Sequence, residues 1–141
     1  MDNKTTHLWN SGRIVVCGWL MLPDEATAEI MAGQGYDVIT IDVQHGLVDY
    51  QKAVSMLQAM NGSPTVPFAR VPWLDPVLVM KLLDAGILGI ICPMINNADE
   101  ARRLASYARY PPVGERSYGP TRAGLILDPD YGGKANEMIQ C

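Results

Sequence analysis

Short apolar runs alternate along this chain with stretches whose apolar residues recur at helical spacing. The apolar runs are rich in branched side chains and nearly continuous, which is typical of strands buried on both faces. Amphipathic patterns follow them, as in Tyr50, Ala53, Val54 and Leu57, which are spaced i, i+3, i+4 and i+7. The predicted strands cover residues 14–22, 37–43, 65–71 and 88–94. The pattern therefore predicts four consecutive βα units.

Capping residues indicate where the helices begin. Asp49 and Asn97 have short polar side chains that accept hydrogen bonds from the first backbone N–H groups of a helix. Asp75 precedes a proline suited to the first helical position, and Asp24 lies where the helix dipole favours an acid. The helices are predicted over residues 24–32, 49–60, 75–85 and 97–108.

The spacing of the units leaves two architectures open. About 25 residues per βα unit fits an open doubly wound sheet or a (β/α)8 barrel. No GxGxxG or GxxxxGK[ST] loop follows a strand, which disfavours a nucleotide-binding open sheet. Residues 111–133 contain four prolines and five glycines, so we expect a long loop or lid there. From Asp130 we expect a helix that leads toward a fifth strand.

The length favours part of a barrel. A closed barrel needs roughly 200 to 250 residues, whereas this chain has 141. We therefore interpret residues 1–141 as a single partial TIM-barrel domain of the α/β class, truncated at its C-terminus. It would hold four βα units plus the loop and helix that lead to strand five. Such an open half-barrel would leave the edge of its fourth strand unpaired.

Composition narrows the functional classes. With 48% hydrophobic and 18% charged residues, the chain has the balance of a globular domain. Its formal net charge of -4 argues against a nucleic-acid partner, and it has no apolar run of about 18 residues that would predict a membrane-spanning helix. The N-terminus lacks the apolar core of a signal peptide, so a cytoplasmic location is expected. Cys17 and Cys92 lack zinc-site spacing and are predicted to be buried in strands.

Candidate site residues are the polar side chains that follow the strands, because ligands bind at the carboxyl ends of parallel strands. His45 follows the second strand and can exchange protons near neutral pH, unless its role is structural. Asp42, three residues earlier, would orient its imidazole. Arg70 ends the third strand, either as a clamp for a carboxylate or enolate oxygen or as an arginine at the surface or paired with Asp42 or Asp75.

Other polar and aromatic residues are assigned structural roles. His7 lies in a polar terminus and is expected at the surface. Asp84 stands near a helix end among leucines and is expected to be solvated or at an interface. The three tryptophans are interpreted as packing residues rather than a binding platform.

Five segments in this order carry a resemblance to a known family. They are DVQHG at 42–46, PFARVPW at 67–73, KLLDAG at 81–86, ICPMINNADEA at 91–101 and YPPVGER at 110–116. Together they resemble the 4-hydroxy-2-oxoheptanedioate (2,4-dihydroxyhept-2-ene-dioate) aldolases, class II pyruvate aldolases related to citrate lyase β-subunit-like enzymes. The match runs from about residue 10 to the end of the chain and suggests the N-terminal half of such an enzyme.

The resemblance implies a (β/α)8 barrel that cleaves a 4-hydroxy-2-oxo acid reversibly to pyruvate and an aldehyde, usually as a homo-oligomer. By resemblance, His45 is the acid/base for the aldol hydroxyl and Asp42 is its partner. Arg70 would hold the pyruvate keto oxygen and stabilise the enolate. Arg116 would bind substrate and, with Gly119, shape the loop over the site. Many relatives have Glu where this chain has Gln44, which leaves a charged role at that position in doubt.

The family also uses a divalent metal, Mg²⁺, Mn²⁺ or Co²⁺, as a Lewis acid for the enolate. Its ligands are a Glu at the end of strand five and an Asp in a later Gly-Pro-x-Asp-Leu-type loop. Both are expected beyond Cys141, so no metal ligand is expected within this chain. Two alternatives remain open: a non-catalytic half-barrel and a CoA-ester lyase of the same superfamily, although the pair of His45 and Arg70 favours the aldolase.

Overall fold

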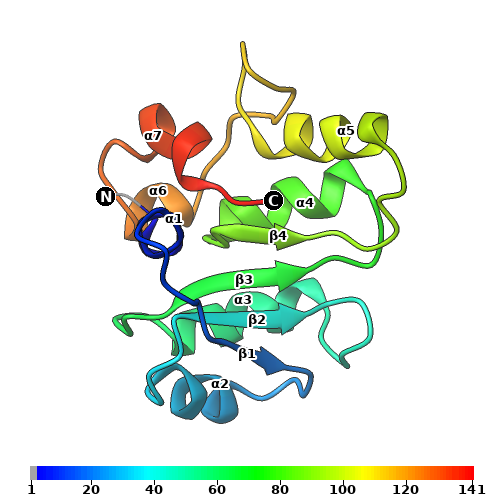
Figure 1. Cartoon of the computed structure of the whole chain (residues 1–141). Coiled ribbons are helices and arrows are strands. Elements are labelled where there is room, and N and C mark those ends of the chain that lie inside the picture. Colours follow the sequence, from blue (N-terminus) through cyan, green and yellow to red (C-terminus); the bar gives the residue numbers. More distant parts are fainter. Residues whose placement is uncertain (1–2) are drawn as a thin grey trace.

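Four parallel strands form one sheet in the order in which they occur along the chain. The computed structural model describes residues 3–141. Its sheet has the order β1-β2-β3-β4, with every neighbouring pair parallel (Figure 1). The strands are β1 (Cys17–Leu20), β2 (Val38–Asp42), β3 (Val66–Arg70) and β4 (Gly89–Ile91). Sequential order without a switch point is the arrangement of a barrel, as predicted.

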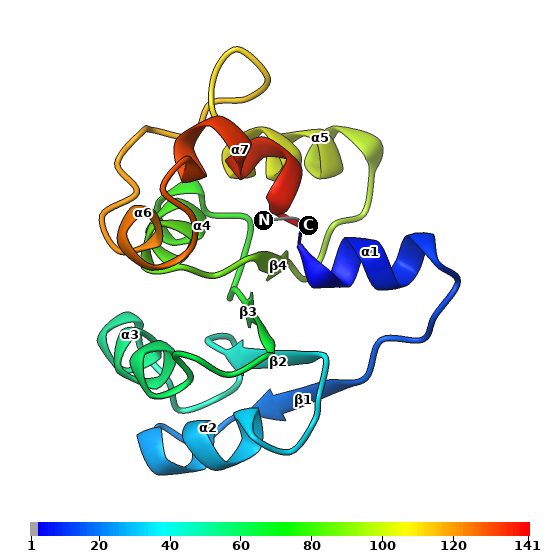
Figure 2. The ribbon, with the colours of Figure 1, turned by 90° about the vertical axis from the view of Figure 1, so that its left-hand side faces the viewer.

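A helix follows each strand, and the predicted caps are present. The helices are α2 (Glu25–Ala32), α3 (Tyr50–Ala59), α4 (Pro76–Ala85) and α5 (Ala98–Ala108). Asp24, Asp49, Asp75 and Asn97 each accept a hydrogen bond from a backbone N–H in the first turn. Helices α2, α3 and α4 cover one face of the sheet (Figure 2). None of the helices within residues 3–141 is long and apolar enough to cross a membrane.

The first strand is shorter than predicted. Strand β1 has four residues, and the flanking Ile14, Val16 and Leu22 are exposed. Because β1 is the edge of the sheet, apolar residues beyond its ends gain no partner strand. Cys17, in this edge strand, is exposed, and Cys92, which follows β4, is half-buried, so their predicted burial in strands was wrong.

Residues 3–141 also contain three further helices: α1 (Lys4–Asn10), α6 (Ala123–Ile126) and α7 (Tyr131–Met138). Helix α7 was predicted. Helix α1 was not, and it lies on the face of the sheet opposite to α3 and α4 (Figure 2). Asn3 caps α1 by accepting from the N–H of Thr5, and its amide nitrogen donates to the carbonyls of Leu88 and Met138 at 3.4 and 2.7 Å.

The outer edge of β4 is partly covered by the end of the chain itself. Gln140 forms a parallel bridge with Gly89, donates its N–H to the carbonyl of Leu88, and accepts from the N–H of Ile90. This is the expected start of a fifth strand. The prediction that this edge would be wholly unpaired was therefore wrong, and β1 is the more open edge.

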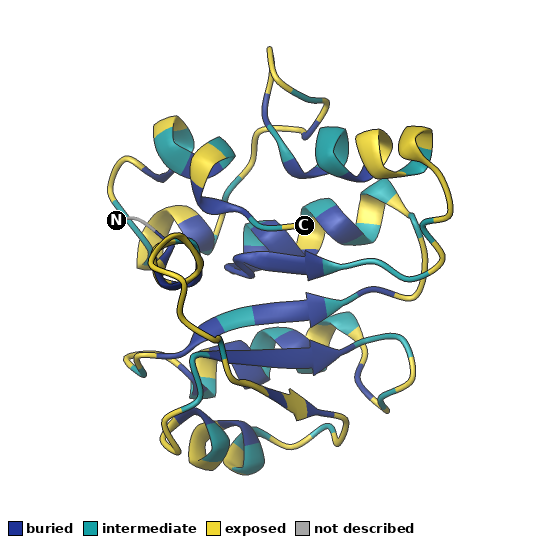
Figure 3. Cartoon of the chain, viewed as in Figure 1, coloured by how far each residue is buried: buried dark blue, intermediate teal, exposed yellow. Residues whose placement is uncertain are grey.

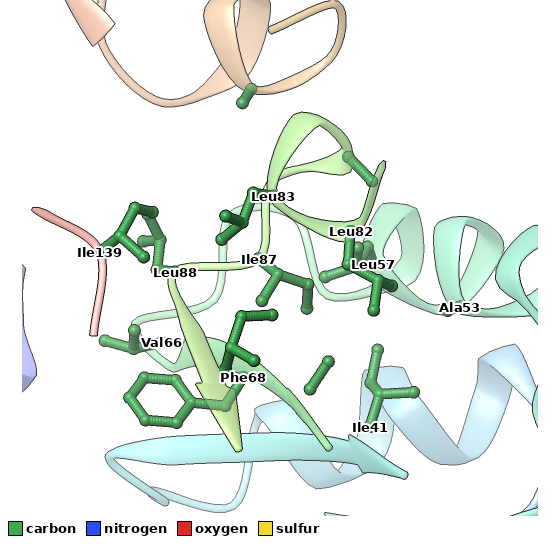
Figure 4. Packing of buried hydrophobic residues seen from close by; sticks show 14 of the residues in the cluster. Ile41, Ala53, Leu57, Val66, Phe68, Leu82, Leu83, Ile87, Leu88 and Ile139 are labelled. Atoms are coloured by element: carbon green, nitrogen blue, oxygen red, sulfur yellow. The ribbon is translucent and has the colours of Figure 1, made fainter. Parts of the chain in front are cut away.

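The core lies between the sheet and its helical layer. Buried side chains of β2 and β3 meet those of α3 and α4, and include Ile41, Ala69, Leu57, Leu82 and Leu83 (Figures 3 and 4). Alternation along the strands turns the other side chains to the opposite face of the sheet. Asp42 and Arg70 belong to that face and stand at the carboxyl ends of their strands.

A buried arginine fastens the segment after α5 to the helical layer. Arg116 is fully buried, donates to Asp84 at 2.7 Å and to the hydroxyl of Tyr131 at 3.1 Å, and lies 4.3 Å from the ring centroid of Tyr110. Nearby, Ser117 donates its backbone N–H to the sulfur of Met80. The segment therefore packs on α4, and residues 111–133 are not one long loop, because they include α6 and the start of α7.

Asp84 was expected to be solvated or at an interface; its side chain is 24% exposed and is paired with the buried Arg116. Within residues 3–141, the Nε atom of Arg116 and the hydroxyl of Tyr110 have no hydrogen-bond partner. A guanidinium buried in this way is costly to leave without its carboxylate. The cluster of Arg116, Asp84, Tyr110 and Tyr131 is a structural unit of the helical layer.

We expect Asp84→Ala to lower the free energy of unfolding by about 3–5 kcal/mol, because it leaves a buried guanidinium without its counter-charge. Asp99→Ala is the matched control: Asp99 also pairs with an arginine, but both side chains are largely exposed, so the change should be under about 1 kcal/mol. Urea unfolding measures both variants. Equal losses of unfolding free energy in the two variants would show that burial of the pair of Arg116 and Asp84 adds nothing to its contribution to stability.

Candidate active site

An ion pair joins β2 to β3 at the carboxyl edge of the sheet. Asp42 and Arg70 end their strands as register partners. Arg70 donates from Nε to Oδ1 of Asp42 at 2.9 Å and from Nη2 to Oδ2 at 2.6 Å. The Asp42 side chain is 0% exposed and that of Arg70 25%. Of the alternatives that the sequence left for Arg70, pairing with Asp42 is present.

The same carboxylate shapes the turn that carries His45. Oδ1 of Asp42 also accepts from the backbone N–H groups of Gln44 at 3.0 Å and His45 at 3.2 Å. Gly46 completes the turn, and a Cβ there would overlap the carbonyl oxygen of Asp42. Only glycine therefore fits at this position without a shift of the backbone.

His45 is exposed, and within residues 3–141 no hydrogen bond of its imidazole is recorded. The sequence predicted that Asp42 orients this imidazole. In the structure Asp42 instead contacts His45 through the backbone amide, and both of its carboxylate oxygens accept hydrogen bonds from Arg70. Asp42 thus positions the residue as a whole and leaves the ring open to a ligand.

The electrostatics of the pair keep both groups charged. The hydrogen bond from Arg70 lowers the pKa of Asp42 to about 2, against the opposing effect of burial and with help from the N–H groups of His45 and Gln44. The same bond raises the pKa of Arg70. Asp42 is therefore a carboxylate at neutral pH and is not itself a proton acceptor there.

A tryptophan that the sequence did not single out belongs to this site. The Cζ atom of Arg70 lies 4.8 Å from the ring centroid of Trp19. Trp19 is 42% exposed although it is a large aromatic residue in a strand. The alternation of side chains along the strands could have revealed this residue. Trp19 pairs in register with Thr40, and Thr40 is two residues before Asp42, so the side chains of Trp19 and Asp42 point to the same face of the sheet.

Arg116, the remaining predicted substrate-binding residue, lies apart from the pair of Asp42 and Arg70. Arg116 is enclosed in the helical layer and its recorded contacts are with protein groups, so its contact with substrate stays a prediction that this geometry does not favour. Within residues 3–141 no group of three or more His, Cys, Asp or Glu residues is arranged to hold a metal ion. Asp75 is occupied as the cap of α4.

The family model described as HpcH/HpaI aldolase/citrate lyase matches residues 15–139. The chain belongs to the HpcH/HpaI aldolase/citrate lyase family.

Individual members of the family are similar over nearly the whole chain. A hydroxypyruvate/pyruvate aldolase of Rhizorhabdus wittichii is 43% identical over 137 residues, which are 97% of this chain and 55% of that protein. A 4-hydroxy-2-oxo-heptane-1,7-dioate aldolase of Shigella flexneri is 37% identical over 99% of this chain and 53% of its own length. The chain thus spans about half the length of the curated relatives it matches.

The fold agrees with a solved member of the family. The crystal structure of an HpcH/HpaI aldolase/citrate lyase family protein from Burkholderia cenocepacia J2315 matches with a TM-score of 0.87 at 31% identity. The match covers 97% of this chain and 57% of that protein. Four parallel strands alternating with helices therefore correspond to half of a TIM-barrel aldolase.

The depressed pKa of Asp42 predicts a definite acid dependence of stability. Because its pKa in the folded state lies below the usual value of 3.8, the carboxylate stabilises the fold above about pH 4, and this contribution is lost as the pH falls toward 2. We expect Asp42→Asn to lower the free energy of unfolding by about 2 kcal/mol at pH 6. The difference from the parent chain should shrink as the pH falls.

Urea unfolding between pH 6 and pH 3 measures this dependence. Asp99→Asn is the matched control, because Asp99 is paired with Arg102 but largely exposed, and it should change little at any pH. A difference for Asp42→Asn that stays constant across this range would contradict the assigned ionisation.

Proposed function

We propose that this chain contributes the substrate-facing pair of Arg70 and His45 to a metal-dependent aldolase that cleaves a 4-hydroxy-2-oxo acid to pyruvate and an aldehyde. The observation that supports this most directly is the state of Arg70. Asp42 occupies Nε and Nη2, and Nη1 has no recorded hydrogen bond within residues 3–141. The names of the two curated relatives, both aldolases of 2-oxo acids, point the same way.

The reaction requires two roles that these residues can fill. A base takes the proton of the C4 hydroxyl, the C3–C4 bond breaks, and C4 leaves as an aldehyde. The electron pair of that bond forms the enolate of pyruvate, which is then protonated at C3. His45, exposed at the edge of the sheet, is suited to accept the hydroxyl proton. Arg70 is suited to donate to the keto oxygen on which negative charge develops.

Asp42 supports both roles without reacting. It fixes the edge of the guanidinium and, through two backbone amides, the turn that holds His45. A bound divalent cation would supply Lewis acidity toward the oxygens of the 2-oxo acid. Within residues 3–141 no cluster of acids fits such an ion, and Asp42 is committed to Arg70. We therefore assign no step to it and place its ligands outside the residues described here.

A fusion protein tests the proposal. Residues 1–141 would be joined to the portion of the Rhizorhabdus wittichii aldolase that the similarity does not cover. We expect pyruvate release from a 4-hydroxy-2-oxo acid with Mn²⁺ or Mg²⁺, and none from residues 1–141 alone, since hard cations need a set of oxygen ligands. The same fusion carrying Arg70→Ala is the control for residual activity. A folded fusion that never releases pyruvate would overturn the proposal.

Two variants of the fusion separate the two roles. Arg70→Ala should slow both aldol cleavage and the exchange of the C3 protons of pyruvate with deuterium, each by roughly 10²–10³-fold, because enolate formation is common to them. His45→Ala should slow cleavage by roughly 10²-fold or more and exchange much less, since pyruvate has no C4 hydroxyl. Pyruvate assays and proton NMR measure the two rates. Losses of the same size in both reactions for both variants would contradict this division.

A further inference from the structure

Trp19 stands against the guanidinium of Arg70, and the proposed reaction gives it no part. The strands bring the two residues together from either side of β2. Trp19 and Thr40 are register partners, as are Asp42 and Arg70 two residues further along. The guanidinium reaches the ring across β2, with 4.8 Å between Cζ and the ring centroid. The site therefore draws on three neighbouring strands rather than on two.

The contacts of Arg70 fix its edge and one of its faces. Two hydrogen bonds to Asp42 hold the edge formed by Nε and Nη2. Such a pair leaves the plane of the guanidinium free to tilt about that edge, and the side chain is a quarter exposed. An aromatic ring packed on one face removes this freedom, and tryptophan is the most favourable ring for a cation.

Trp19 lies on the face of the sheet that carries the ion pair. Its neighbour Leu20, on the helix-covered face of the same strand, is 2% exposed, whereas Trp19 is 42% exposed. The ring thus stays at the open face of the sheet, where it hides little apolar surface from water and where Arg70 lies.

We propose that Trp19 is a positioning residue for Arg70: its indole covers one face of the guanidinium, so that Nη1 keeps a fixed direction toward the substrate. The part of this role that involves substrate rests on the proposed function. The geometric part, a guanidinium held by a ring, is a property of the chain itself. Loss of the ring should therefore loosen Arg70 without unfolding the sheet.

The geometric part is tested on residues 1–141 by NMR of the arginine side chains, with Arg70→Lys identifying the Nε–H signal of Arg70. In Trp19→Leu this proton should exchange with water about tenfold faster, since the cover of the ring is lost. Trp19→Phe should retain most of the protection. Trp9→Leu is the matched control, because Trp9 is similarly exposed at 48% but lies in α1. Equal exchange in Trp19→Leu and the parent chain would overturn the proposal.

The catalytic part is tested in the fusion protein. We expect Trp19→Leu to lower kcat by about tenfold with a change in KM under about threefold, because a misdirected donor weakens the transition state more than the bound substrate. Trp19→Phe should restore most of kcat. An unchanged kcat in Trp19→Leu, or no recovery in Trp19→Phe, would overturn a positioning role in the reaction. A fusion without turnover in any form would count against the proposed function alone, and the exchange rates would still decide whether Trp19 holds Arg70.

Discussion

The arrangement at the carboxyl edge depends on one buried carboxylate. Asp42 has no exposed surface, and a charge in such a place is tolerated only when it is paired and hydrogen-bonded. Here it accepts four hydrogen bonds, two from Arg70 and one each from the amides of Gln44 and His45. The need to satisfy this single group thus determines the direction of an arginine, the path of a turn and the placement of a histidine.

Most of the fold could be predicted because most of its helices and strands are marked by patterns within their own residues. Apolar runs marked the central strands, and short polar side chains marked the first turns of α2 to α5. The errors lie where long-range contacts decide. Helix α1 is capped by Asn3, which is also anchored by carbonyls 85 and 135 residues away, and no pattern within the terminus reveals such partners. Strand β1 was extended too far because apolar residues at a sheet edge have no second neighbour.

The sequence could predict which residues belong to the candidate site better than it could predict the contacts between them. The position of a residue at a strand end indicated Asp42, His45 and Arg70, since parallel strands gather these ends at one edge. It could not show that the two oxygens of Asp42 are taken by Arg70 rather than by the imidazole. Nor could it show that Arg116 is buried, because its partners Asp84 and Tyr131 lie 32 and 15 residues away. Which side chains pair with each other depends on tertiary packing, whereas the position of a residue at a strand end can be read from the sequence.

The anchoring of Asn3 has a consequence for how the chain folds. One amide group, that of Asn3, joins the start of α1 to Leu88, just before β4, and to the end of α7, and Thr6 adds a second link through Gln140. Contacts between residues so far apart in sequence close large loops and therefore form late. We therefore expect helix α1 to dock late in folding, together with helix α7.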